Sequence, residues 1–339
     1  MKRGSISRLA HALVEVFDIP VRVQRVAFVG ELAILMYHGV VRHPLPVPDW
    51  CFVEEDQFAE EMHYLARRTR VLPLNTALQQ MRDGTLDEPT VAITFDDGFQ
   101  SVHDIAFTVL KELSLPSTVF LVTGFIDTSR TIWFCELIKM LSITDAQGMT
   151  WRGEQFDLRG RAAKAASSAR LQSLLKNLHP DALQKELTRI QRILEVADET
   201  MEAVHAPFQM LDRKSIATLG ESGLVEFGAH TESHTILTRV DHGRAAMEIE
   251  NSVRSVSELA GAPCHLFAYP NGRREDYDRA TIAALSRTGI SSAVTTVLGP
   301  NTRGTPELEL RRYGVGAGIT LTRFKIEIHH IRAHIARAE

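Results

Sequence analysis

The chain has 339 residues, a formal net charge of −4 and a pI of about 6.4. This balance argues against a nucleic-acid partner, which needs a concentrated basic face. The content of 44% hydrophobic and 24% charged residues is that of a globular protein with a large core. Cys51, Cys135 and Cys264 are too far apart for a disulfide framework or a cysteine zinc site.

Residues 1–30 precede the first predicted strand. Polar residues interrupt any apolar core of a signal peptide, and the spacing of Ile6, Leu9 and Leu13 predicts an amphipathic helix. Such a helix usually packs on its own domain, with weak contact to a membrane surface as the alternative. No apolar run approaches the ~20 residues that span a bilayer. We therefore expect a cytoplasmic protein without a transmembrane segment.

Strands and helices alternate over the next hundred residues. In chain order they are a strand at 33–38, a proline-rich loop at 42–50, a helix from Glu54, a short strand at 71–72, a helix at 74–82, a strand at 91–95, a helix at 102–113 and a strand at 117–122. This alternation indicates parallel βα units.

The pattern changes between residues 127 and 211. This stretch contains no convincing strand of the buried type, and its Arg, Lys, Gln, Ala and Leu residues recur at helical spacing. Helices are predicted at 132–141, 162–178 and 182–196. We interpret 127–211 as a helical insertion near the mouth of the domain.

The alternation resumes after residue 211. The predicted elements are a helix at 212–221, a strand at 225–229, a helix at 243–259, a strand at 265–269, a helix at 276–287, strands at 292–296 and 310–313, and a terminal helix at 321–338. Seven or eight strands separated by helices favour a closed or distorted α/β barrel over an open sheet. We assign 31–126 and 212–320 to the barrel and 321–339 to a C-terminal helix. In such barrels the chemistry lies at the carboxyl ends of the strands.

Two adjacent carboxylates follow a buried strand. Residues 91–95 run directly into Asp96, Asp97 and Gly98. Like charges this close raise one pKa unless a cation lies between them. The pair therefore suggests a metal site with one carboxylate as ligand and the other as base. A solvated acidic turn is the structural alternative.

A histidine pair follows another predicted strand. His230 and His234 come directly after residues 225–229, whereas the similar pair His330 and His334 lies within the predicted terminal helix. One Asp and two His form a recurring ligand set for a catalytic divalent metal. His38 also ends a strand, so these groups should converge on one face of the barrel.

These motifs resemble those of a known family. Residues 94–98 and the His230-Thr231-x-x-His234 segment are similar to the first two motifs of the polysaccharide deacetylases, the NodB-homology carbohydrate esterases. Residues 267–272 resemble the third motif. Residues 36–40 resemble the leading Tyr-His motif of the subgroup that includes poly-N-acetylglucosamine deacetylases. The resemblance covers 31–126 and 212–315 and implies a distorted (β/α)7 barrel.

The resemblance also implies a reaction, the metal-dependent removal of N-acetyl groups from an amino sugar. By motif position, Asp97, His230 and His234 would hold the metal, with Zn²⁺ the preferred ion, and Asp96 would be the base. A backbone N–H near Tyr269 would steady the oxyanion. One wall of the groove would be formed by the residues Tyr269, Pro270, Asn271 and Gly272.

One family feature is missing. Many members have an arginine that orients the base, at the position where this chain has Ala268. Arg273, Arg274 and Arg311 are the candidates to replace it.

His38 is the predicted general acid. The other candidates for the acid are histidines that would not reach the mouth of the barrel. His329, His330 and His334 lie on the predicted terminal helix, and His265 begins its strand, at the end of the barrel opposite the site. A histidine with a pKa near 6.5 suits proton donation near neutral pH. A buried histidine satisfied by the backbone is the alternative.

Two other functions stay open. Related folds hydrolyse small formamides and cyclic amides, and a non-catalytic carbohydrate-binding relative is the third class. A binder has no need of a base beside a metal site, so the intact set of acids and histidines argues against that class. Without an export signal, a lipid-linked or nucleotide-linked sugar or a nascent glycan is the favoured substrate.

Overall fold

The computed structural model describes residues 29–328. Eight parallel strands form its main sheet, and β1 pairs along its whole length with β5, which closes seven of them into a barrel. The eighth, β4, pairs only with the start of β5. The strands are β1 (Leu32–Tyr37), β4 (Arg70–Val71), β5 (Thr90–Phe95), β6 (Ser117–Leu121), β9 (Val225–Ala229), β10 (Leu266–Ala268), β11 (Ser292–Leu298) and β12 (Leu310–Gly314). The expected (β/α)7 barrel is thus confirmed.

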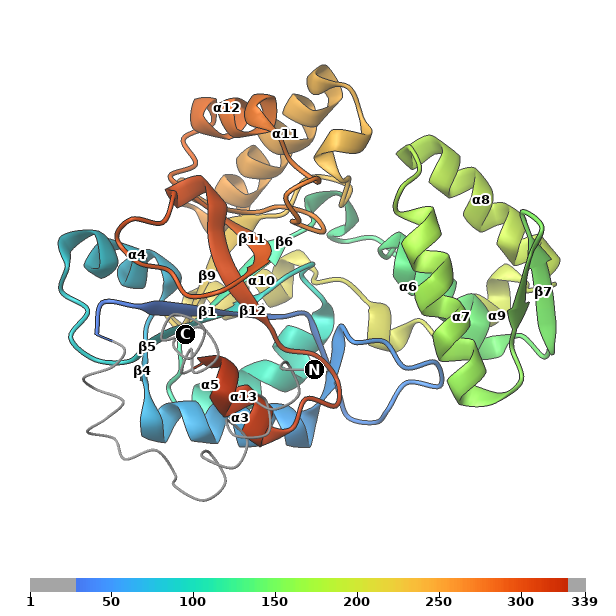
Figure 1. Cartoon of the computed structure of the whole chain (residues 1–339), viewed down its shortest axis with the longest axis horizontal. Coiled ribbons are helices and arrows are strands. Elements are labelled where there is room, and N and C mark those ends of the chain that lie inside the picture. Colours follow the sequence, from blue (N-terminus) through green and yellow to red (C-terminus); the bar gives the residue numbers. More distant parts are fainter. Residues whose placement is uncertain (1–28, 329–339) are drawn as a thin grey trace, which may run out of the picture.

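Helices cover the outside of this barrel (Figure 1). They are α3 (Glu55–Arg68), α5 (Phe107–Glu112), α10 (Arg213–Glu221), α11 (His242–Ala260), α12 (Arg279–Arg287) and α13 (Leu321–Ile328). A further helix, α4 (Leu74–Asp83), packs its buried residues against the interior of the barrel. A short π-helical turn, Val102–Ala106, precedes α5, and two short strands, β2 (Gly39–Val41) and β3 (Phe52–Glu54), pair beside the barrel. Within residues 29–328, no helix combines the length and apolar character needed to cross a membrane.

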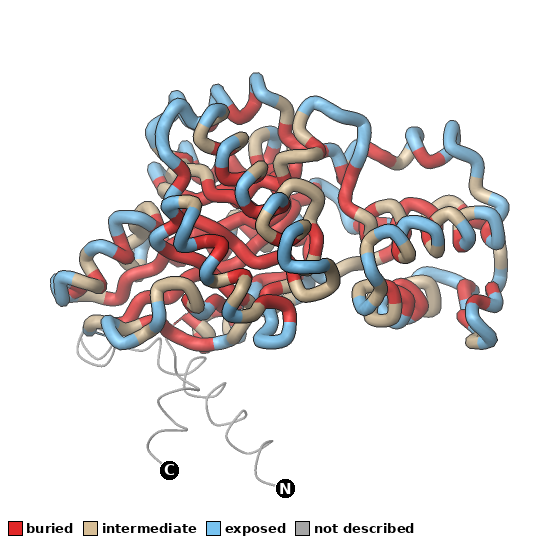
Figure 2. Tube along the Cα trace, turned by 90° about the horizontal axis from the view of Figure 1, so that it is seen from above, coloured by how far each residue is buried: buried red, intermediate tan, exposed pale blue. Residues whose placement is uncertain are grey.

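The barrel strands are apolar throughout because both of their faces are covered. In β1, Leu32 and Ile34 point to the interior, where α4 also contributes Leu78, whereas Ala33 and Leu35 pack against the outer helices. This alternation follows from the two-residue period of a strand. Figure 2 shows the resulting continuous buried centre.

Between β6 and β9 the chain leaves the barrel and forms a separate lobe (Figure 1). The lobe contains α6 (Trp133–Ile143), α7 (Gly160–Leu175), α8 (Pro180–Ile193) and α9 (Asp198–Ala203). The first three of these helices correspond to those expected from the sequence. The lobe buries its own apolar cluster, which includes Trp151 and Leu171 and continues into Phe52 and Phe99 on the barrel side.

The lobe also contains an antiparallel hairpin that was not among the expected elements. Its strands are β7 (Gly148–Trp151) and β8 (Glu154–Asp157). Arg152 and Gly153 form the two-residue turn, with φ of 50° and 80°. Positive φ at both positions is typical of the turns that suit hairpin twist.

Two expected segments lie largely outside the described residues. One is the N-terminal helix predicted within 1–30. The other is the end of the terminal helix, because α13 is described only to Ile328. His329, His330 and His334 belong to that undescribed part.

Candidate active site

The predicted site residues meet at the carboxyl ends of three strands. His38 follows β1, Asp96 and Asp97 follow β5, and His230 follows β9 with His234 one turn later. All five line one cavity of about 690 Å³. The parallel strands therefore bring together groups that lie almost two hundred residues apart in the sequence.

Asp97, His230 and His234 form a compact cluster. The Nε2 atoms of His230 and His234 lie 3.4 and 3.3 Å from Oδ1 of Asp97. One ligand atom from each residue falls within 4.8 Å of the others. Nδ1 of His230 donates to the carbonyl oxygen of Ala268 at 2.7 Å, which directs Nε2 toward Asp97.

The surroundings of this cluster fit a metal ion. Both carboxylate oxygens of Asp97 are buried without a hydrogen-bond partner, which is costly for a charged group. Burial lowers the pKa of His234 to about 4, so its imidazole is neutral and able to act as a ligand at neutral pH. Burial raises the pKa of Asp97, but the nearby histidines outweigh it and the carboxylate stays ionised. A bound cation would satisfy all three groups.

The loop that carries the second histidine is held by Glu248 of α11. Oε2 of Glu248 accepts from the backbone N–H groups of Glu232 and Ser233 at 3.0 and 2.9 Å. Oε1 accepts from the hydroxyls of Ser233 and Thr235 at 2.6 and 3.2 Å. The loop needs this support because His234 has a φ of 57°, a strained value for a residue with a side chain.

Asp96 is paired with Arg312 of β12. The guanidinium donates from Nη1 to Oδ1 and from Nη2 to Oδ2, both at 2.7 Å, and it also donates from Nε to the carbonyl oxygen of Thr295. Burial raises the pKa of Asp96, but Arg312 more than offsets this and holds it well below the usual range. Asp96 is therefore an oriented, ionised carboxylate beside the cluster of Asp97, His230 and His234.

This pairing corrects the expected replacement for the family arginine. Arg274 forms an ion pair with Glu309, and Arg273 approaches Glu275 at 3.9 Å. Arg311 has an exposed side chain, because it precedes Arg312 on the strand and faces the other way. None of the three expected arginines forms the contact with Asp96.

His38 faces the same cavity from β1. Its Nδ1 atom is buried without a hydrogen-bond partner, so the backbone does not satisfy that atom. Its ring lies edge-on to Trp50, with 4.9 Å between ring centroids. Trp50 is 49% exposed and, with Trp133 and Phe134, gives the cavity an aromatic wall that the sequence did not indicate.

The third motif contributes less than expected. Asn271 lines the cavity, but Tyr269 points away and stacks on Tyr277 at 4.3 Å between ring centroids. The Tyr269 amide donates to the carbonyl oxygen of Val294 at 3.2 Å, so this particular N–H is used by the sheet ladder. Pro270 and Gly272 form the turn beside Asn271, where Gly272 donates its N–H to the Pro270 carbonyl oxygen.

Comparison with known proteins identifies the family. The polysaccharide deacetylase family model matches residues 83–293, more than half of the chain. The chain therefore belongs to the polysaccharide deacetylase family, hydrolases of carbon–nitrogen bonds other than peptide bonds.

Individual relatives agree with this assignment. The poly-beta-1,6-N-acetyl-D-glucosamine N-deacetylase of Staphylococcus epidermidis is 32% identical over 79 residues, which are 23% of this chain and only 27% of that protein. The Streptococcus pyogenes deacetylase PplD, solved in complex with acetate, has a TM-score of 0.58 and 16% identity, covering 88% of this chain and 98% of its own. IcaB from Ammonifex degensii has a TM-score of 0.52 and 18% identity, covering 89% and 96%. The two structures support the fold alone.

Proposed function

We propose that the protein hydrolyses the N-acetyl group of an amino sugar in a glycan or glycan precursor, using a divalent metal. Zn²⁺ is the preferred ion for one carboxylate and two imidazole ligands. The observation that carries the proposal is the shared cavity. It places an ionised, oriented Asp96 beside the three-residue cluster, with His38 on its wall.

The roles follow from the chemistry of amide hydrolysis. A divalent metal held by Asp97, His230 and His234 would lower the pKa of water and polarise the acyl carbonyl. Asp96 accepts the proton of the attacking water, and Arg312 keeps its carboxylate fixed during that transfer. His38 donates a proton to the nitrogen as the carbon–nitrogen bond breaks, so that acetate and a free amine leave.

The aromatic wall supports a sugar as substrate. Trp50 and Trp133 present flat apolar surfaces with polar edges, which suit the faces of a pyranose ring. The relative from S. epidermidis carries the name of a deacetylase of poly-β-1,6-N-acetyl-D-glucosamine. Short β-1,6-linked N-acetylglucosamine oligomers are therefore the first substrates to assay.

The base is tested with Asp96→Asn, which keeps the size of the side chain but not its basicity. We expect kcat for acetate release to fall at least ~100-fold, while the metal content stays at the wild-type level. Asp104, an exposed aspartate on the outer π-helical turn, provides the matched control Asp104→Asn. Near-normal turnover by Asp96→Asn would remove Asp96 from the mechanism.

The ligand assignment is tested by metal analysis of dialysed protein. We expect about one divalent ion per chain in the wild type, loss of the ion in His230→Ala, and retention in His265→Ala, whose side chain is exposed. Equal metal content in the two variants would contradict the assignment. Formate release from small formamides, or glycan binding without acetate release, would favour the other classes.

The acid is tested by comparing leaving groups. His38→Ala should keep the metal and lose most activity on amides, whose nitrogen must be protonated as it leaves. Acetate esters with good leaving groups need no such proton and should suffer much less. Equal losses on both kinds of substrate would make His38 a structural residue.

A further inference from the structure

A second cavity adjoins the catalytic one. It has a volume of about 450 Å³ and lies between the lobe and the loop after β9. Trp133, Lys176, His234 and Ile236 line both cavities, so the two are continuous beside a proposed metal ligand. A substrate held at the catalytic centre could extend into this space.

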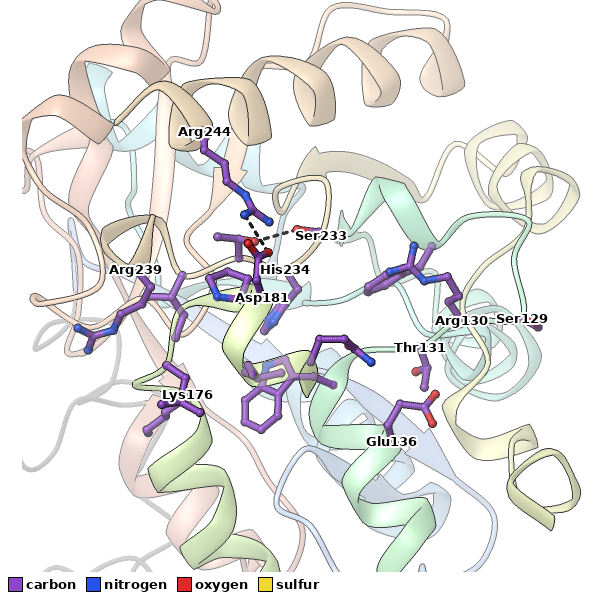
Figure 3. Close-up of a pocket in the computed structure, with 18 residues that line it drawn as sticks. Ser129, Arg130, Thr131, Glu136, Lys176, Asp181, Ser233, His234, Arg239 and Arg244 are labelled. Atoms are coloured by element: carbon purple, nitrogen blue, oxygen red, sulfur yellow. Dashed lines mark hydrogen bonds and ion pairs between the residues drawn. The ribbon is translucent and has the colours of Figure 1, made fainter. Parts of the chain in front are cut away.

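The wall of the second cavity is positively charged. Figure 3 shows His234 near the centre, with Lys176 and Arg239 on one side, Arg130 on the other, and Arg244 above. The same wall has only two carboxylates, those of Glu136 and Asp181. This excess of positive charge is a feature of the cavity wall and not of the whole chain, which has a net charge of −4.

Both carboxylates already have cationic partners. Asp181 pairs with Arg244 at 3.1 Å, and Glu136 pairs at 3.3 Å with Lys139, which does not line the cavity. No ion pair among residues 29–328 therefore compensates the other three cations of the wall, which are Arg130, Lys176 and Arg239.

Two of these cations are partly withdrawn from water. Lys176, directly after α7, is half-buried, and its side-chain ammonium has no hydrogen bond or ion pair among the described residues. Burial and the nearby Arg273 guanidinium lower its pKa, and the carboxylates of Asp276 and Glu275 offset this only in part. Arg239 donates to Asn177 at 3.2 Å, but its Nε atom is buried without a partner. Partly buried cations that make no ion pair are destabilising unless an anion joins them.

We propose that this cavity is a subsite for an anionic group on the acetylated sugar, held by Lys176 with Arg239. This inference rests on the proposed function and narrows it to acidic saccharides, bearing either a phosphate or a carboxylate. Guanidinium and ammonium groups bind both anions through charge-assisted hydrogen bonds. Neutral acetylated oligomers would fill the catalytic cavity but leave the cations uncompensated.

The test compares three N-acetylglucosamine glycosides that differ at the anomeric substituent: methyl, phosphate and β-glucuronate. Binding is measured by calorimetry on zinc-loaded Asp96→Asn protein, so that the result does not depend on turnover. We expect at least one acidic glycoside to bind about tenfold more tightly than the methyl glycoside, with the advantage falling as salt is raised. Whichever acid binds more tightly identifies the anion.

Lys176→Met in the same background should abolish this advantage, so that the acidic glycosides bind no more tightly than the methyl glycoside. Lys176→Arg should retain most of it. Lys185→Met removes an exposed lysine of the same lobe and should have no effect. An advantage that survives Lys176→Met would indicate that the anion binds the metal and would overturn the subsite. Equal binding of all three glycosides would overturn it too, while acetate release by the wild type would still support the proposed function.

Discussion

Asp96 owes its charge and its orientation to one guanidinium. The side chains of Asp96 and Arg312 are 3% and 0% exposed, so neither charge is solvated by bulk water. Removing one member of such a pair leaves the other buried and uncompensated, which costs more than the pair contributes. The residue that orients the proposed base is therefore also important for stability.

Arg312→Met should lower the free energy of unfolding by about 3–5 kcal/mol, measured by urea denaturation. Arg312→Lys keeps the charge but not the two parallel hydrogen bonds. It should remain folded and yet lose at least ~10-fold in kcat for acetate release. Full activity in a folded Arg312→Lys enzyme would show that the two-point contact has no role in catalysis.

The residues of the candidate site differ in how well the sequence predicted them. Asp97, His230 and His234 were predictable because each follows a recognisable strand within a motif. Arg312 was not, because its partner lies 216 residues away and Arg311 precedes it. A short strand gives no internal sign of which of two neighbouring arginines faces inward, and a shift of one residue reverses the choice.

Glu61 is a second buried carboxylate. Its pKa is raised, whereas that of Asp96 is lowered. It accepts from the Tyr37 hydroxyl at 2.8 Å, which ties α3 to β1. Burial raises its pKa from 4.5 to about 7, so between those pH values the folded chain binds a proton that the unfolded chain does not. This contribution to stability is complete below pH 4.5 and is lost as the pH rises through 7.

Glu61→Gln should therefore flatten the pH dependence of stability. The difference in unfolding free energy between pH 5 and pH 8 should change by about 2–3 kcal/mol relative to wild type. Glu112→Gln, at an exposed position of α5, should leave it unchanged. Identical slopes in wild type and Glu61→Gln would place the pKa of Glu61 near its ordinary value.

At the scale of elements, the loop that carries His234 is held by hydrogen bonds on two sides. Glu248 of α11 makes its four hydrogen bonds on one side. On the other side, Gly124 donates to the Glu232 carbonyl oxygen at 2.7 Å, and a Cβ on Gly124 would lie only 2.6 Å from that oxygen. The position of His234 thus depends on a helix and on the turn that follows β6, neither of which contributes a proposed ligand.

Glu248→Ala should weaken zinc binding by about 10–100-fold, measured by competition with a chromophoric chelator. Glu248→Gln can still accept from the two amides while its NH₂ group faces the hydroxyls, so it should recover part of the affinity. Glu250→Ala removes an exposed glutamate from the same helix and serves as the control. Unchanged zinc affinity in Glu248→Ala would mean that the loop holds its shape alone.

The strands differed in how well the sequence predicted them. The barrel strands were clear because a strand covered on both faces is apolar at every position, as in β5. The β7–β8 hairpin was not expected because its strands have only four residues each, half of them exposed in β7. Its signal was the Arg152-Gly153 turn, which is weaker than an Asn-Gly pair.

For the whole molecule, the lobe acts as one wall of the catalytic cavity. Small residues of α7, among them Ala165, Ala169 and Ser173, line the cavity opposite the barrel. They lie four residues apart and therefore on one face of the helix. We expect this face to limit the length or shape of the substrate.

Ala169→Trp should narrow the cavity from the lobe side. The kcat/KM for acetylated tetramers should fall at least ~10-fold, whereas a small acetate ester should be hydrolysed at nearly the wild-type rate. Ala166→Trp places the same bulk on an exposed position of α7 that does not line the cavity. Equal losses for both variants, or for both substrates, would contradict a gating role of the lobe.

Because Arg312 lies on the last barrel strand, it is synthesised after the other residues of the site. The ribosome delivers Asp97, His230 and His234 well before β12, the strand that pairs with β1 and β11. The proposed metal ligands therefore leave the ribosome while the proposed base still lacks its guanidinium. If Asp96 is the base, we expect fragments that end before residue 310 to be unable to carry out the reaction, because they lack the guanidinium that orients it.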